Sequence, residues 1–141
     1  KEQIHYIGID PSNIEVEVTE NYDINSVSRV IEILDELVEC GVSIAIDDFG
    51  QGYAALNYLL KFPASTIKID KEFVQNINQP IGDKIIQSIM SLANLLGKKV
   101  VAEGVETVDQ LAYLAQMNCN EYQGFIYSKP VEFGRFKELI K

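Results

Sequence analysis

The chain has 141 residues, of which 47% are hydrophobic and 23% charged, which suits a single folded domain with its own core. Its formal net charge of −9 argues against non-specific binding to DNA or RNA and against direct contact with anionic membranes, since both need clustered Lys and Arg. Two cysteines are too few for a disulfide framework or a zinc site, so we expect reduced thiols and a cytoplasmic location.

Strand-like and helix-like segments alternate along the chain. In chain order, they are the strand Ile14–Thr19, the helix Asn25–Cys40, the strand Val42–Ile46, the short helix Tyr53–Leu60, the strand Thr66–Ile69, the helix Asp83–Leu96, the strand Lys99–Ala102, a helix opening at Thr107, the strand Tyr122–Tyr127 and the helix Phe133–Ile140. Repeated strand-then-helix units predict an α/β fold with a parallel sheet covered by helices.

The helices carry recognisable signals. Thr107, followed three residues later by Gln110, predicts a capping box at a helix start. Gly41 suits the end of the first helix. In that helix, the apolar residues expected on one face are Val27, Val30, Ile31, Leu34, Leu37 and Val38.

The adjacent acids Asp47 and Asp48 are the most informative polar residues, because they directly follow the apolar run Val42–Ile46. Two neighbouring carboxylates at the mouth of a buried strand repel each other and cost desolvation energy. A divalent cation would make the arrangement favourable, since hard cations take oxygen ligands. The pair therefore predicts a metal site.

Other polar residues also stand at or near strand ends, where α/β barrels and open sheets place their active sites. They are Glu17, Glu20, Lys68, Asp70, Glu103, Glu106 and Gln123. Several have an ordinary structural explanation, such as a solvated strand acid for Glu17, a turn for Glu20 or a helix-dipole acid for Glu106. Lys68 could be a snorkelling amine, but its very apolar strand favours a charge partner or a phosphate. Glu103 follows an apolar run, as Asp47 does. Their convergence on one edge of the sheet favours a functional site.

Five segments, EVEVTE, IAIDDFGQGYAAL, IKID, VVAEGVET and QGFIYSKP, together resemble the EAL domain, a bacterial family that hydrolyses cyclic di-GMP. The resemblance covers essentially the whole chain. It implies a TIM-type (β/α)8 barrel with one atypical antiparallel strand. Residues 1–141 would then be the C-terminal part of a single EAL phosphodiesterase domain, about its last five βα units.

The departures from the family pattern also matter. The glutamate of the EAL signature and an asparagine that joins the same metal both lie upstream of Lys1 in the family. Gln51 replaces the usual threonine in the loop after the paired aspartates. Because five strands cannot close an eight-stranded barrel, we expect open sheet edges and an apolar interior facing water. Order would then require a homo-oligomer or a complementing segment, and the chain alone would be inactive.

The resemblance implies specific roles in a two-metal site. Glu17 would ligate the first metal, Asp47 would bridge both, and Asp48 would hold the second. Glu103 would sit at the second metal near the attacking water, and Lys68 would contact that water or the scissile phosphate. Supporting or substrate-binding roles would fall to Glu20, Asp70, Glu106 and Gln123.

These roles fit hydrolysis of cyclic di-GMP to linear pGpG with two Mg²⁺ or Mn²⁺ ions. Zn²⁺ would be expected to recruit Cys or His. The alternatives are a catalytically inactive EAL-type receptor for the dinucleotide and another metal-dependent barrel enzyme, such as one that stabilises an enolate. The residues that precede Lys1 in the gene, and a dinucleotide-binding assay with and without Mg²⁺, would discriminate among them.

Overall fold

The computed structural model describes residue 6 and residues 8–19, 27–50 and 59–140. Its elements are the 3₁₀ helix η1 (Pro11–Asn13), the strands β1 (Glu15–Val18), β2 (Ser43–Phe49), β3 (Thr66–Ile69), β4 (Lys99–Glu103) and β5 (Glu121–Gln123), and the helices α2 (Val27–Glu39), α4 (Lys71–Gln75), α5 (Pro80–Leu95), α6 (Val108–Gln116) and α7 (Phe133–Leu139). In this part of the chain, no helix is both long and apolar enough to cross a lipid bilayer.

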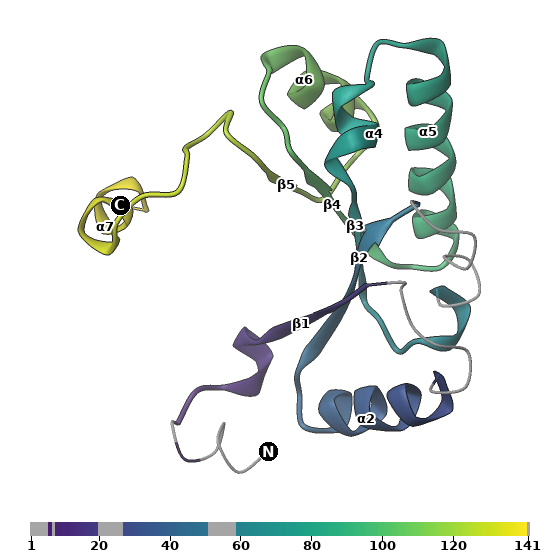
Figure 1. The fold of residues 1–141 in the computed structure, drawn as a ribbon, viewed down its shortest axis with the longest axis vertical. Helices are drawn as coiled ribbons and strands as arrows, with labels where there is room; N and C mark the ends of the chain where they lie inside the picture. Colours follow the sequence, from purple (N-terminus) through teal and green to yellow (C-terminus); the bar gives the residue numbers. More distant parts are fainter. Residues whose placement is uncertain (1–5, 7, 20–26, 51–58, 141) are drawn as a thin grey trace.

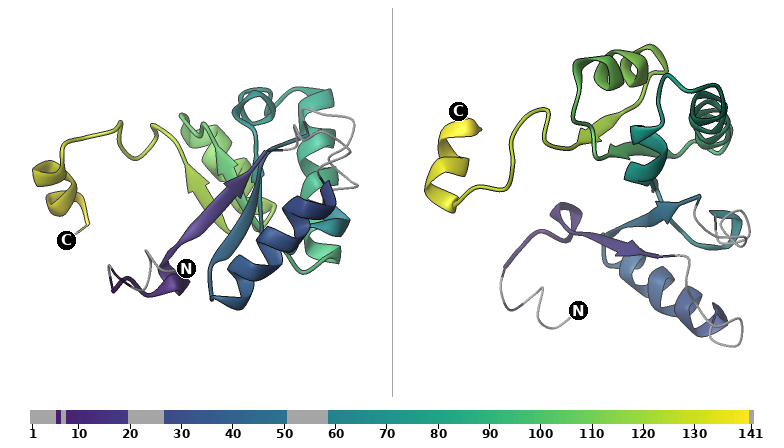
Figure 2. Two further views of the ribbon diagram at one scale, coloured as in Figure 1. Left: turned by 60° about the horizontal axis from the view of Figure 1, so that its bottom comes forward. Right: turned by 45° about the horizontal axis from the view of Figure 1, so that its top comes forward.

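The five strands form one parallel sheet in the order β1-β2-β3-β4-β5, so each strand pairs with its neighbour in sequence. This sequential order is the topology of a barrel wall, whereas a doubly wound sheet reverses its order at a switch point. Helices α2, α4, α5 and α6 gather on one side of the sheet, and α7 stands apart at the end of the segment that follows β5 (Figures 1 and 2).

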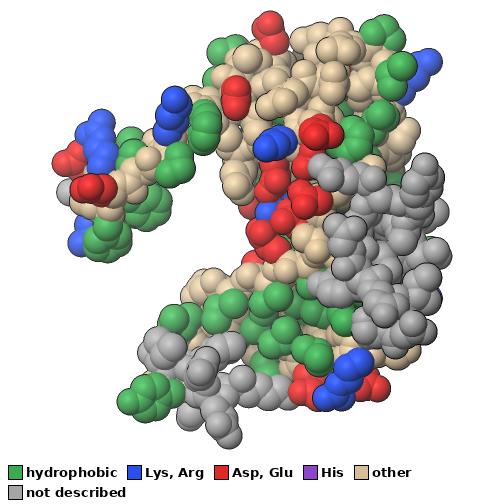
Figure 3. Space-filling view, viewed as in Figure 1, with side chains coloured by type: hydrophobic (Ala, Val, Ile, Leu, Met, Phe, Trp, Pro, Cys, Tyr) green, Lys and Arg blue, Asp and Glu red, His purple; other side chains and the backbone are tan. Residues whose placement is uncertain are grey.

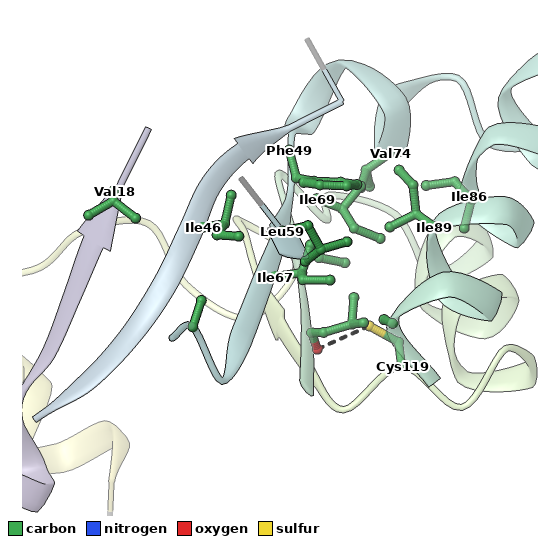
Figure 4. Close-up of a cluster of buried hydrophobic side chains, with 14 of the residues drawn as sticks. Val18, Ile46, Phe49, Leu59, Ile67, Ile69, Val74, Ile86, Ile89 and Cys119 are labelled. Carbon is green, nitrogen blue, oxygen red and sulfur yellow. Dashed lines mark hydrogen bonds between the residues drawn. The ribbon is translucent and has the colours of Figure 1, made fainter. Parts of the chain in front are cut away.

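The two faces of the sheet differ in chemistry, as the alternation of side chains along a strand requires. On the helix side, Ile67 and Ile69 of β3 pack in one core with Val74, Ile86 and Ile89 of the helices (Figure 4). The opposite face is mostly polar, with Glu15, Glu17, Ser43, Thr66, Lys68, Lys99 and Glu103 beside the small Ala45 and Val101. The expectation of an apolar interior facing water is therefore wrong for the described strands.

Several element boundaries differ from the sequence predictions. The second strand runs on to Phe49 instead of ending at Ile46, and the fifth ends at Gln123. The fifth strand stops where the chain bends at Gly124, and Ile126 then donates its N–H to the carbonyl of Val105. The predicted helix Tyr53–Leu60 falls mostly outside the described residues.

The helices differ from the predictions in three places. Helix α5 begins at Pro80 because proline suits the first helical position, where no N–H partner is needed. Helix α4 was not predicted at all. The capping box at Thr107 and Gln110 is confirmed, with both reciprocal bonds present. Val38, expected on the buried face of α2, is 41% exposed.

Candidate active site

An irregularity in β2 shapes the site. Ile46 pairs with Ile67 and Phe49 with Ile69, so β2 contains one residue more than β3 between these points. At this bulge, Asp48 takes a left-handed backbone conformation with φ of 52°. In a regular strand, consecutive side chains point to opposite faces, but a bulge re-aims them. Carboxylate oxygens of Asp47, Asp48 and Glu103 consequently lie within 4.8 Å of one another.

Lys68 lies at the centre of the acidic residues. Its Nζ is 2.6 Å from Glu17 Oε1, 2.9 Å from Asp47 Oδ1 and 2.7 Å from Glu103 Oε1. These partners come from β1, β2 and β4, so one side chain on β3 joins four neighbouring strands. The lysine side chain is only 6% exposed. Figure 3 shows the acidic side chains gathered over the middle of the sheet, on the side that faces α7.

The surroundings fix the charge state of Lys68. Burial by itself favours the neutral amine, but the carboxylates of Glu103, Glu17 and Asp47 outweigh burial and raise the pKa of Lys68 above its ordinary value of 10.5. Lys68 therefore stays an ammonium ion at physiological pH.

The surroundings of Asp48 disfavour its charged form. Desolvation, followed by the negative charges of Asp47, Asp70 and Glu103, raises the pKa of Asp48 above its ordinary value of 3.8. Among the described residues, Asp48 takes part in no ion pair. The cluster thus holds four carboxylates, including that of Glu17, against one ammonium, and positive charge would stabilise it.

The residues fit a divalent cation. Asp47 Oδ1 is buried and has no hydrogen-bond partner of acceptable geometry in the described part of the chain, although the ammonium of Lys68 is close. The carboxylate oxygens of Asp47, Asp48 and Glu103 together form the all-oxygen donor set that Mg²⁺ and Mn²⁺ take. The residues that could hold such ions are those the sequence predicted, Glu17, Asp47, Asp48 and Glu103.

The predicted supporting residues divide into three kinds. Asp70 is buried and caps α4, where its Oδ1 accepts the N–H of Glu72 at 2.7 Å. Glu106 and Gln123 are exposed, and Gln123 lies beside Glu103 in the β4–β5 register. Glu20 lies outside the described residues.

Glu106 and Gln123 line a groove of about 680 Å³ that runs from Glu103 to the apolar side chains of α7. Sequence reasoning missed two further residues of this groove, Lys71 and Gln75, because it missed α4. The available signal was Asp70, since an aspartate is a preferred N-cap.

A sequentially ordered parallel sheet, with charged side chains gathered at the carboxyl ends of its strands, defines a protein of the α/β-barrel class. The EAL domain family model matches residues 1–130, and the chain belongs to this family. The predicted fold, part of a TIM-type barrel, is confirmed by solved EAL-domain structures of the same architecture.

Named relatives indicate the chemistry of the family. The chain is 39% identical over 135 residues to the cyclic di-GMP phosphodiesterase NbdA of Pseudomonas aeruginosa, covering 95% of this chain and 17% of NbdA. It superposes on the EAL domain of Mycobacterium smegmatis DcpA with a TM-score of 0.90 and 34% identity, covering 96% of this chain and 61% of that one. The chain also superposes on the manganese and cyclic di-GMP complex of Klebsiella pneumoniae BlrP1 with a TM-score of 0.83 and 35% identity. This match covers 92% of this chain and 33% of the BlrP1 chain.

Proposed function

We propose that the domain containing this chain is a cyclic di-GMP phosphodiesterase that hydrolyses its substrate to linear pGpG with two Mg²⁺ or Mn²⁺ ions. Residues 1–141 would form the C-terminal part of a single EAL phosphodiesterase domain. The observation that carries the proposal is the cluster of Asp47, Asp48 and Glu103, in which Asp47 and Glu103 also contact the ammonium of Lys68. The names of relatives such as NbdA supply the substrate class.

In this proposal, Glu17, Asp47, Asp48 and Glu103 hold the cations. When bound, the cations supply an ionised water at neutral pH and neutralise charge on the phosphate. Lys68 has two tasks. Its ammonium holds Glu17, Asp47 and Glu103 close together in the metal-free protein, and it presents positive charge where the phosphodiester would lie.

The remaining predicted residues act at the edge of the site. Glu106 and Gln123 line the groove next to Glu103, where they would hold waters or shape the floor beneath the dinucleotide. Asp70 supports the site by capping α4, which carries Lys71 into the same groove. Glu20 keeps its proposed role in supporting the loop that begins at Asp47.

The test is hydrolysis of cyclic di-GMP by the intact EAL domain, followed by chromatographic detection of pGpG. We expect turnover that depends on Mn²⁺ or Mg²⁺ and falls at least 100-fold in Asp48→Asn and Lys68→Met. Asp109→Asn, a charge-matched change at an exposed position in the first turn of α6, is the control and should keep full activity.

Undiminished turnover in EDTA would refute the metal-dependent mechanism. Tight, metal-independent binding of the dinucleotide without cleavage would instead favour the alternative of a non-catalytic receptor.

A further inference from the structure

A second side-chain pair joins β1 to β3 beside the acidic cluster. The hydroxyl of Thr66 on β3 donates a hydrogen bond of 2.9 Å to Glu15 Oε2 on β1. Strand β2 lies between them, so β1 and β3 share no backbone hydrogen bonds. Thr66 is 4% exposed, and leaving its buried hydroxyl without a partner would cost free energy. The bond therefore ties an edge strand to a central one.

This pair repeats the geometry of the neighbouring ion pair. Glu17 follows Glu15 by two residues, and Lys68 follows Thr66 by two, so all four side chains stand on one face of the sheet. Both contacts cross β2 in the same direction. Ala45, which is in register with Glu17 and Thr66, is fully buried between them, and its small side chain leaves room for the crossing.

Glu17 depends on this arrangement more than the other partners of Lys68 do. Its side chain is 47% exposed, compared with 20% for Asp47 and 19% for Glu103. It also lies on β1, which pairs only with β2 among the described strands. The hydrogen bond of Thr66 to Glu15, two residues earlier on the same strand, would limit how far Glu17 can move away from Lys68.

We propose that Thr66 is a positioning residue, whose hydroxyl holds Glu15 and thereby places Glu17 at Lys68 and at the proposed metal site. The link to metal rests on the proposed function, whereas the link to Lys68 does not. The role would be specific to a hydroxyl at position 66, because no apolar side chain can donate the bond to Glu15.

The experiment compares Thr66→Val with Thr66→Ser in the intact EAL domain. In metal-free protein, the ¹⁵N–¹H signal of the Lys68 ammonium, assigned with Lys68→Met, reports the position of Glu17. Mn²⁺ affinity is measured separately by calorimetry. We expect Thr66→Val to shift or broaden the Lys68 signal and to weaken Mn²⁺ binding at least fivefold. Thr66→Ser should restore the signal and bring the affinity within twofold of wild type.

The control for a general loss of stability is Ile89→Val, in the core on the opposite face of the sheet, which should change neither readout. If Thr66→Val fails to fold, Glu15→Leu removes the hydrogen-bond acceptor at an exposed position. It should cause the same change in the Lys68 signal and in Mn²⁺ affinity, whereas Glu15→Gln should leave both near wild type. A wild-type Lys68 signal in Thr66→Val, or in Glu15→Leu, would overturn the proposal. Failure of the wild-type domain to bind Mn²⁺ would instead refute the proposed function, and the Lys68 signal would still decide the role of Thr66.

Discussion

Lys68 holds the site together, because its ammonium contacts carboxylates from three different strands. The sequence favoured a charge partner or a phosphate for a lysine in so apolar a strand, and the structure places three carboxylates at its ammonium. Sequence alone could not identify them, because the partners are separated from Lys68 by tens of residues and meet only through strand register. Likewise, Asp47 and Asp48 were recognisable as a pair, but the bulge that turns both toward Glu103 leaves no mark in the sequence.

We expect Lys68→Met to destabilise the metal-free protein by about 2 kcal/mol, because three carboxylates lose their shared cation. This is below the 3–5 kcal/mol typical of a fully buried pair, since Glu17 remains partly hydrated. The loss should shrink when Mn²⁺ is present to supply positive charge. Urea unfolding in EDTA and in Mn²⁺ measures both effects, and an equal loss in the two conditions would contradict the prediction.

We expect Asp48→Asn to stabilise the metal-free protein at neutral pH. An acid whose pKa is raised on folding contributes its full stability below its unfolded pKa, and this contribution is lost as the pH rises through the folded value. At neutral pH, the charged Asp48 is therefore unfavourable, and asparagine tolerates the same left-handed backbone.

The gain should be about 0.5 kcal/mol or more, and stabilisation by added Mn²⁺ should disappear. Calorimetric melting in EDTA and in Mn²⁺, with Asp109→Asn as the control, checks both parts. A lower melting temperature for Asp48→Asn in EDTA would contradict the electrostatic interpretation.

At the scale of elements, strands were predicted better than the segments between them. Apolar, β-branched runs such as TIKI identify buried strands directly, and β3 matches its predicted bounds. Helix α4 was not predicted because five residues are too few to show a helical period of apolar positions. Its only sequence signal was the N-cap residue Asp70. After β5, Ile126 donates its N–H to the carbonyl of Val105, a tertiary contact that no local pattern reveals.

We expect Gly124→Ala to destabilise the protein by about 1–3 kcal/mol, the usual cost of overpacking. A Cβ at this position would clash with the backbone of Val105, and backbone cannot move aside as a side chain can. Gly134→Ala in α7 is the matched control, because a Cβ there meets nothing within 4 Å and alanine favours the helix. Chemical denaturation of both variants gives the comparison, and equal stabilities would contradict it.

At the scale of the whole molecule, the sheet formed by the described strands has two open edges. Within the described residues, β1 pairs only with β2, and β5 only with β4. Helix α7 also presents Phe133 and Phe136 to solvent, with Phe133 71% exposed, and its C-cap residue Ile140 is exposed as well. Unpaired strand edges and exposed apolar side chains favour association with another chain.

We therefore predict that residues 1–141, produced alone, form a homo-oligomer or require a complementing chain segment for order. Sedimentation velocity over a range of concentrations tests this directly. A monodisperse monomer with native-like circular dichroism would contradict it.

We also predict negligible hydrolysis of cyclic di-GMP by residues 1–141 alone, because the chain covers only 61% of the EAL domain of Mycobacterium smegmatis DcpA. A rate within tenfold of that of an intact domain, a difference of only about 1.4 kcal/mol in activation free energy, would refute this expectation.

The thiols of Cys40 and Cys119 differ in burial, so their reaction rates can report on local unfolding. Cys119 is buried, with its Sγ near the carbonyl oxygens of Val100 and Glu121, and burial raises the pKa of its thiol. Cys40, after α2, is only half-buried. An alkylating reagent should thus modify Cys40 in the native protein and reach Cys119 only when the region around β4 and β5 opens. The ratio of the two labelling rates, read by mass spectrometry, would rank variants by how often that region unfolds, without any substrate or metal.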